Sequence, residues 1–140
     1  MRNVVLLYVM LHMLTPVWAQ TSADETAIAE TVQLYFDGMM QRDKSKLEQA
    51  FHPEAKLIGY RGAELHVTPF AQWLEATSKG GKRDLSTHHN QLTGIEITGY
   101  TAIAKAELNW PGIYYFDYLT LLRIDGHWKI VHKTWYEETR

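Results

Sequence analysis

The stretch Tyr114–Tyr136, YYFDYLTLLRIDGHWKIVHKTWY, contains two strand-like runs joined by a tight turn. Asp125-Gly126 separates the runs, and aspartate-glycine between alternating apolar segments strongly favours a β-hairpin with a two-residue loop. With this loop, residue 124 faces 127, 121 faces 130, 119 faces 132 and 117 faces 134. The stretch therefore predicts a long antiparallel hairpin whose two faces are separated by residue parity.

The two faces of this hairpin differ in their chemistry. One is apolar near the turn and polar further away, with Leu121, Ile130, Leu119, His132, Asp117 and Tyr115 among its residues. The other mixes aromatic side chains with cations, namely Phe116, Tyr118, Lys129, Val131, Lys133 and Trp135. Because aromatic side chains are enriched at protein interfaces, we expect this second face to pair with another copy of the chain.

The whole chain is short and nearly neutral. Its 140 residues are 46% hydrophobic and 12% aromatic, which suits one compact domain with its own core. A formal charge of −2 and the lack of a sustained Lys/Arg run argue against nucleic-acid binding. Because the sequence has no cysteine, disulfides, thiolate metal sites and a cysteine nucleophile are excluded.

The N-terminal residues 1–19, MRNVVLLYVMLHMLTPVWA, have the order of a secretory signal peptide. Arg2 is followed by a short apolar run from Val4 to Leu14, and Ala19 is a small residue suited to cleavage. The alternative is an uncleaved membrane anchor, although the run is short for a bilayer-spanning helix. We expect residues 20–140 to form a single domain of a secreted or periplasmic protein, without membrane attachment after cleavage.

Three helices are expected before the long hairpins. Ser22-Ala-Asp-Glu25 has the pattern of a capping box and precedes apolar residues at helical spacing, which predicts a first helix at about 23–41. Asp43 can cap a second, short helix that Pro53 ends, and Thr68-Pro69 can start a third. The following segment 78–84, with its glycines and three cations, is expected to be a solvated surface loop that could also attract an anionic ligand.

The remaining residues predict strands. Two short strands are expected at 55–60 and 64–67, and a second long hairpin spans 87–110 with its turn at Gly99-Tyr100. In a regular register this hairpin has His89, Gln91 and Trp110 on its inner face. Helices segregated from an antiparallel sheet define an α+β fold, and we expect the sheet to curl around the helices.

The segments AIAETVQLYFDGMMQRD, FHPEAKL and above all FDYLTLLRIDGHWKIVHKTWY resemble the nuclear transport factor two superfamily. Within it they are most similar to the group named "putative lumazine-binding", close to the polyketide-cyclase-like proteins, and the resemblance covers residues 24–137. It implies a cone-shaped, curved antiparallel sheet wrapped around three N-terminal helices, an apolar cavity between them, and a homodimer formed through the outer sheet face. The superfamily contains isomerases, dehydratases, cyclases and non-catalytic binding or assembly domains, and a fold alone does not choose among them.

Asp117 and His132 are the candidate catalytic pair, since they would lie diagonally across the inner face of the last hairpin. In an apolar cavity such a pair can act as general base and general acid. The alternatives are a buried pair that only fixes the strand register, or an aspartate that accepts a hydrogen bond from a tyrosine. Asp117 is the one acidic residue on the expected inner strands, which argues against the paired aspartates of steroid isomerase chemistry.

Further side chains are expected to line the cavity and contact a ligand: Tyr35, Tyr60, Trp73, His89, Gln91, Trp110 and Tyr115. Core packing is the alternative for those on the helical side. No metal site is expected, because His88 and His89 are neighbours in a strand and face opposite ways. No cofactor is expected either.

Three functions remain open. The chain could be an exported protein that binds a small apolar or aromatic molecule in its cavity. It could be an enzyme of the cyclase, isomerase or dehydratase kind, in which Asp117, assisted by His132, removes a proton next to a carbonyl. It could also be a dimerising accessory domain without a ligand. The expected site depends on an unbroken register in both hairpins, because a shift by one residue moves each side chain to the opposite face.

Overall fold

The computed structural model describes residues 17–140, which form three helices and one six-stranded sheet. The helices are α1 (Val17–Gln41), α2 (Lys44–Ala50) and α3 (Phe70–Thr77). The strands are β1 (Phe51–Arg61), β2 (Glu64–Pro69), β3 (His89–Thr98), β4 (Thr101–Trp110), β5 (Ile113–Ile124) and β6 (His127–Thr139). Their order is β2-β1-β6-β5-β4-β3, with β1 and β6 parallel and the other neighbours antiparallel.

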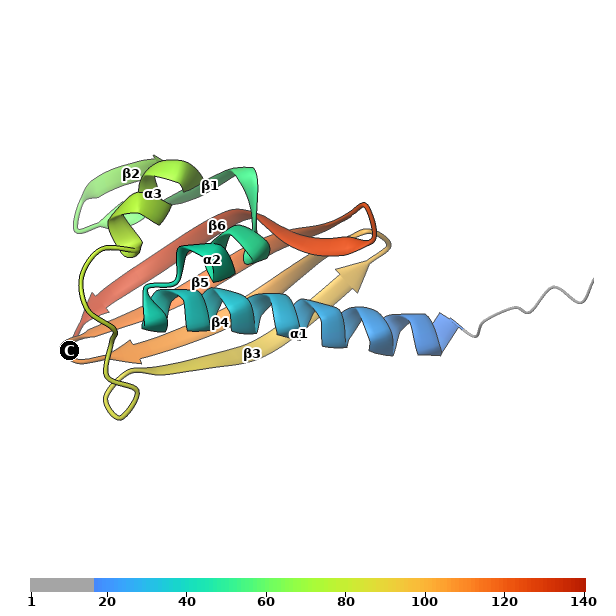
Figure 1. Ribbon diagram of the computed structural model, residues 1–140, viewed down its shortest axis with the longest axis horizontal. Coiled ribbons are helices and arrows are strands. Elements are labelled where there is room, and N and C mark those ends of the chain that lie inside the picture. The colour runs from blue at the N-terminus through green and yellow to red at the C-terminus, as the bar shows by residue number, and fades with distance from the viewer. Residues whose placement is uncertain (1–16) are drawn as a thin grey trace, which may run out of the picture.

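The sheet is curved and open, and the helices cover its inner side (Figure 1). Helix α1 runs along β3 to β6, while α2 lies beside α1 and α3 lies over β1 and β2. The expected α+β architecture is thereby confirmed. Within residues 17–140, none of the helices has the length and apolar character needed to span a bilayer.

The first helix begins earlier than expected. Because α1 starts at Val17, Ser22–Glu25 lies inside the helix and is not a capping box. Asp24 instead accepts hydrogen bonds from Trp128 Nε1 (3.0 Å) and an Arg123 guanidinium nitrogen (3.1 Å), which attaches α1 to the last hairpin. The expected leader lies outside the described residues, except for 17–19, which form the first turn of α1.

The elements around the second helix follow the sequence signals in part. The Asp43 side chain caps α2 by accepting a hydrogen bond from the Lys46 backbone N–H, as expected. Pro53 does not end the helix, because β1 already begins at Phe51 and Pro53 lies within that strand. It falls where the β1–β6 register is irregular, and a residue without a backbone N–H is tolerated at such a place. Thr68 belongs to β2, so Pro69 takes the N-cap position of α3 without a side-chain cap.

Both hairpins turn where the sequence indicates. Asp125 and Gly126 both have positive φ angles, 50° and 82°, as a two-residue loop of this type requires. Residue 124 pairs with 127 and 121 pairs with 130, as predicted. In the other hairpin Gly99 has a φ of 60°, and residue 97 pairs with 102 and 95 with 104. The register is therefore correct near both turns.

Further from the turns, each hairpin contains a β-bulge that overturns the predicted register. Thr120 pairs with His132 while Leu121 pairs with Ile130, so Val131 is an extra residue in β6. Thr93 is the extra residue in β3, between the pairs that involve residues 92 and 94. A bulge bends its strand and increases the local twist, which suits a sheet that curves around helices. Beyond each bulge, the side chains of the bulged strand, β6 or β3, lie on the face opposite to the one expected, whereas those of β5 and β4 keep their expected face.

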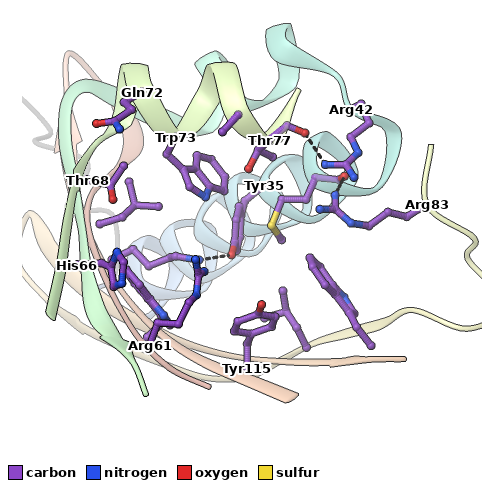
Figure 2. Close-up of a pocket in the computed structure, with 17 residues that line it drawn as sticks. Tyr35, Arg42, Arg61, His66, Thr68, Gln72, Trp73, Thr77, Arg83 and Tyr115 are labelled. Atoms are coloured by element: carbon purple, nitrogen blue, oxygen red, sulfur yellow. Dashed lines mark hydrogen bonds between the residues drawn. The ribbon is translucent and has the colours of Figure 1, made fainter. Parts of the chain in front are cut away.

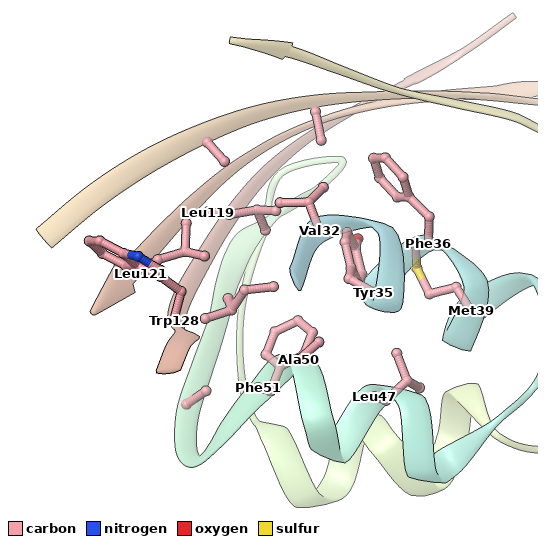
Figure 3. Packing of buried hydrophobic residues seen from close by; sticks show 14 of the residues in the cluster. Val32, Tyr35, Phe36, Met39, Leu47, Ala50, Phe51, Leu119, Leu121 and Trp128 are labelled. Atoms are coloured by element: carbon pink, nitrogen blue, oxygen red, sulfur yellow. The ribbon is translucent and has the colours of Figure 1, made fainter. Parts of the chain in front are cut away.

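The core lies between α1 and the concave face of the sheet (Figure 3). Large side chains from α1, α2 and β1 meet leucines of β5 and Trp128 of β6 there. On β4, Ala102, Ala104 and Ala106 are fully or almost fully buried in the same cluster. These small residues share the buried cluster with side chains of α1, so the space above them belongs to the core.

Candidate functional site

A cavity of about 390 Å³ lies between α3 and the strands of the sheet, a volume within the range of small-molecule sites. Its aromatic walls are Tyr35, Trp73, Trp110, Tyr115 and Trp135, and its aliphatic lining is Met39, Leu57, Ala76 and Leu108. Its polar lining is Arg42, Arg61, Arg83, Lys133, His66, Thr68, Gln72 and Thr77. This described lining contains four Arg or Lys side chains and no carboxylate.

Three side chains from three elements form a buried polar cluster at the cavity wall. Tyr35 of α1 donates a hydrogen bond from its hydroxyl to Asp117 Oδ2 of β5 (2.5 Å). Lys133 Nζ of β6 donates to Tyr35 Oη (2.9 Å) and to Asp117 Oδ2 (3.1 Å). Asp117 is 0% exposed and Lys133 is 8% exposed, and Asp117 Oδ1 has no hydrogen-bond partner. Tyr35 and Lys133 thus line the cavity, whereas Asp117 does not.

The bulge at Val131 creates this cluster. Because of it, Leu119 faces Lys133 and Asp117 faces Trp135, so that Lys133 and Trp135 point inward. Trp135 also needs the absence of a side chain at Gly59, its neighbour on β1. A Cβ atom at Gly59 would lie 2.4 Å from the Trp135 ring, closer than any normal contact. A glycine on β1 therefore provides the space for a tryptophan of the cavity wall.

The electrostatics of the cluster favour a protonated tyrosine. Burial, followed by the charge and hydrogen bond of Asp117, raises the pKa of Tyr35 well above its ordinary value. The Lys133 ammonium lies over three rings, 5.3 Å from the centroid of Tyr35, 5.6 Å from Trp73 and 5.9 Å from Trp135. Ring faces attract a cation at such distances. One carboxylate, one phenol and an aromatic surround therefore hold the amine in place.

Two arginines mark another part of the same cavity. Arg42 and Arg83 lie close together at one end, whereas Arg61 and His66 lie at the other end, with Tyr35 between them (Figure 2). The Arg83 guanidinium lies 4.5 Å from the centroid of Trp110. Burial and the charge of Arg42 lower the pKa of the Arg83 side chain.

The structure brings together some of the expected site residues. Tyr35, Trp73, Trp110 and Tyr115 line the cavity. Asp117 is buried directly behind the cavity wall and accepts a hydrogen bond from the Tyr35 hydroxyl. An aspartate bonded to a tyrosine in this way was one of the alternatives to the catalytic pair. The roles of these residues in binding or catalysis remain predictions.

Four other expected residues lie away from the cavity. His132 is on the outer face, because the bulge at Val131 reverses the parity of β6, and the expected Asp117–His132 pair is wrong. The bulge at Thr93 likewise exposes His89 and Gln91. Tyr60 is 58% exposed, because it alternates with residues of β1 that face inward.

Sequence reasoning missed Lys133, Trp135, Arg42 and Arg83. The first two were placed on the outer face, and the last lies in the segment expected to be a solvated loop. That expectation is wrong for Arg83, whose backbone N–H donates to the Met40 carbonyl (2.8 Å). The three cations of segment 78–84 were the sequence signal that could have indicated a site for an anion there. Among residues 17–140, no group of three or more His, Cys, Asp or Glu side chains could hold a metal ion.

The fold and cavity define a protein of the nuclear transport factor two-like class, in which a curved sheet and helices enclose a pocket. A family model described as "putative lumazine-binding" matches residues 23–136, and the chain belongs to this family. The expected superfamily is confirmed.

Known proteins similar to this chain include one that is named an aldolase. The chain is 30% identical over 125 residues to aldolase FrzH from Cladobotryum sp, a match covering 86% of this chain and 96% of that relative.

Solved structures of two bacterial proteins show the same fold. An NTF2-like protein of unknown function from Shewanella baltica OS155 superposes with a TM-score of 0.78 at 20% identity, covering 90% of this chain and all of its own. Another, from Silicibacter pomeroyi DSS-3, gives 0.77 at 24% identity, covering 84% of this chain and 98% of its own.

Proposed function

We propose that the protein is an aldolase-type enzyme that acts on a small molecule. It binds a carbonyl compound in the cavity and activates it through Lys133. The observation that carries this proposal is the position of the Lys133 amine, at the cavity wall and hydrogen-bonded to Tyr35 and Asp117. The name of the relative from Cladobotryum supports the same class of reaction. A lysine in an apolar site is a common nucleophile towards carbonyl groups.

The hydrogen bonds offer a way to produce a neutral amine. Lys133 can pass a proton to Tyr35 while Tyr35 passes its own proton to Asp117 Oδ2, along contacts of 2.9 and 2.5 Å. The result is a neutral amine, a neutral phenol and a neutral carboxylic acid. Because charges are costly in a site closed to water, a ligand that fills the cavity favours this transfer.

The amine nitrogen then adds to the substrate carbonyl carbon. The carbinolamine loses its oxygen as water, with the proton that returns from Asp117 through Tyr35, and leaves a protonated imine beside the Asp117 carboxylate. In a β-hydroxy carbonyl substrate, the Cα–Cβ bond breaks and its electrons form an enamine with the imine nitrogen. The hydroxyl proton passes to the Tyr35–Asp117 pair as the first carbonyl product leaves. Protonation of the enamine carbon and hydrolysis release the second product and the free amine.

The three residues have different roles in this scheme. Lys133 is the catalytic residue, because it touches the substrate. Tyr35 lines the cavity and relays protons, whereas Asp117 is completely buried and acts through the other two. The aromatic walls hold the substrate and exclude water, which protects the imine from early hydrolysis.

Binding without turnover is the second candidate function. It is supported by the description of the family and by the five aromatic rings of the cavity. In this case the Lys133 ammonium would be a hydrogen-bond donor to an oxygen of a small apolar or aromatic ligand. The two candidates differ in whether a covalent bond to Lys133 can form.

Acetylacetone distinguishes them without knowledge of the natural substrate. A neutral lysine amine condenses with this 1,3-diketone to an enaminone, which adds the diketone mass less one water and absorbs in the near ultraviolet. We expect the full-length chain to form one adduct, mapped to Lys133 by peptide mass spectrometry. Lys133→Arg should form no adduct. The control Lys105→Arg changes a lysine of β4 that is paired with Glu96 of β3, and it should react like the parent. Folded protein that forms no Lys133 adduct would refute imine chemistry and favour binding alone.

We also propose that the chain is exported and forms a homodimer through the outer sheet face. That face exposes aromatic side chains of β5 and β6, with Tyr118 49% and Tyr136 58% exposed. Trp135 and Lys133, expected there from the sequence, lie inside and do not contribute. Light scattering should give a dimer mass that Tyr118→Glu reduces to a monomer; a monomeric parent protein contradicts the dimer. N-terminal sequencing of exported material should begin at Gln20, whereas an intact Met1 in that material contradicts cleavage after Ala19.

A further inference from the structure

Arg42 and Arg83 have no part in the chemistry proposed for Lys133. Arg42 follows the last residue of α1, and Arg83 belongs to the segment between α3 and β3. Both line the cavity, and they lie together at the end opposite to Arg61 and His66 (Figure 2). The cavity therefore has a second cationic region, which shares no residue with the Lys133 cluster.

Backbone carbonyls hold both guanidinium groups in place. Arg42 donates to the carbonyl oxygens of Thr77 (2.7 Å) and Gly81 (3.2 Å), and Arg83 donates to that of Met39. These bonds use only some of the five N–H donors that each arginine carries. Side chains fixed in this way lose little further freedom when they bind a ligand.

Neither guanidinium is neutralised by the protein. Among the side chains of residues 21–140, no carboxylate lies within ion-pair distance of Arg42 or Arg83. The other cations of the cavity differ, because Arg61 is paired with Glu137 (3.4 Å) and Lys133 with Asp117 (3.1 Å). Two like charges in a half-buried wall repel each other, and an anion placed between them would relieve that repulsion.

We infer that Arg42 and Arg83 form an oxyanion-binding subsite, and that the substrate is a flat carbonyl compound with a carboxylate or phosphate group at its far end. Guanidinium groups match the planar oxygens of both groups through paired hydrogen bonds. Trp110 and Tyr115, whose rings are 5.5 Å apart, provide an aromatic wall for the flat part between the two ends. The position of the carbonyl rests on the function proposed for Lys133, whereas the position of the anion does not.

Three matched probes test the subsite in the full-length chain. They are para-formylbenzoate, its neutral amide para-formylbenzamide, and para-formylphenyl phosphate, which share an aromatic aldehyde and differ at the opposite end. Calorimetry measures the affinity of each, and borohydride reduction followed by mass spectrometry measures the imine formed at Lys133. The comparison of benzoate with phosphate identifies which anion the arginines prefer.

We expect the parent protein to bind the better of the two anions at least about tenfold more tightly than the amide, the effect of one charge-assisted hydrogen bond. Arg83→Gln should abolish this preference, and an unchanged circular dichroism spectrum shows that the variant is folded. Arg42→Gln should reduce the preference. Equal binding of anions and amide by the parent protein, or a preference unaffected by both substitutions, overturns the inference.

The same probes separate this inference from the proposed function. Loss of the imine in the parent protein with the anion preference intact would contradict only the role of Lys133. An imine with all three aldehydes and no anion preference would contradict only the arginine subsite. Lys133→Met should keep the preference and lose the imine.

Discussion

Lys133 and Asp117 form an ion pair of 3.1 Å in the core, although a regular hairpin would place Lys133 on the outer face. The pair exists because one extra residue, Val131, reverses the parity of β6 beyond the bulge. The Tyr35 hydroxyl completes the arrangement from α1. A buried charge pair costs more in desolvation than a similar apolar contact, which suggests a role beyond stability.

The first prediction concerns the removal of the buried carboxylate charge. Asp117→Asn leaves the Lys133 ammonium without its counter-ion in a site that is almost closed to water. Breaking a buried pair from one side costs about 3–5 kcal/mol, so urea denaturation should show a loss of this size. The double variant Asp117→Asn with Lys133→Met should recover much of it, because no charge then remains.

An exposed ion pair provides the matched control. Glu96→Gln removes the partner of Lys105 at the surface, where such a pair contributes less than about 1 kcal/mol. Equal losses for Asp117→Asn and Glu96→Gln would contradict the buried arrangement.

The second prediction follows from the raised pKa of Tyr35. Its hydroxyl loses a proton near pH 10 in the unfolded chain and only at higher pH in the folded protein. Above pH 10 the folded state therefore holds more protons than the unfolded state, and the stability contributed by this group falls as pH rises. The unfolding free energy of the parent protein should decrease more steeply from about pH 9.5 upward than that of Tyr35→Phe. Parallel profiles for the two proteins would show that Tyr35 is not buried against Asp117.

Much of the fold could be read from local patterns. Asp125-Gly126 gave the last turn because two residues with positive φ are needed there, and Asp43 marked the start of α2. Helical and strand periodicity and the family resemblance gave three helices and a curved sheet. The turn, the cap and the helices each depend on a few neighbouring residues, whereas the curvature of the sheet was expected from the resemblance.

The site could be read only in part, because it depends on two single-residue irregularities. Val131 is β-branched and follows Ile130, and both residues suit a regular strand, so nothing local marks the bulge. Thr93 precedes Gly94, a weak sign of a bulge. Arg83 was missed for another reason, since the carbonyls that hold it lie more than forty residues earlier in the chain.

The third prediction tests the β6 register directly. His132→Ala should leave the acetylacetone adduct at Lys133 unchanged, because the imidazole lies on the outer face. Lys133→Arg should abolish the adduct, although it keeps a positive charge beside Asp117. These two adjacent positions therefore respond in opposite ways. If His132→Ala prevented the reaction, His132 would face the cavity as in a regular hairpin, and this result would contradict a bulge at Val131.

The fourth prediction uses the contact between β1 and β6. Gly59→Ala places a methyl group 2.4 Å from the Trp135 ring and 2.7 Å from the backbone carbonyl oxygen of Trp135. Both the ring and the backbone of β1 or β6 must therefore move. Overpacking of this kind costs about 1–3 kcal/mol, and the displaced indole should change the tryptophan emission. Because Trp135 lines the cavity, binding of para-formylbenzamide should weaken as well.

Gly81→Ala is the control for this substitution. A Cβ atom at Gly81 has no neighbour within 4 Å, and its backbone does not have the left-handed conformation that favours glycine. We expect stability within about 1 kcal/mol of the parent, with unchanged emission, since the alanine also reduces the freedom of the unfolded chain. The measurements are urea denaturation, fluorescence and calorimetry on the three proteins. If Gly59→Ala behaved like Gly81→Ala in all three, Trp135 would not pack against β1, and the cavity would lack the wall that this tryptophan provides.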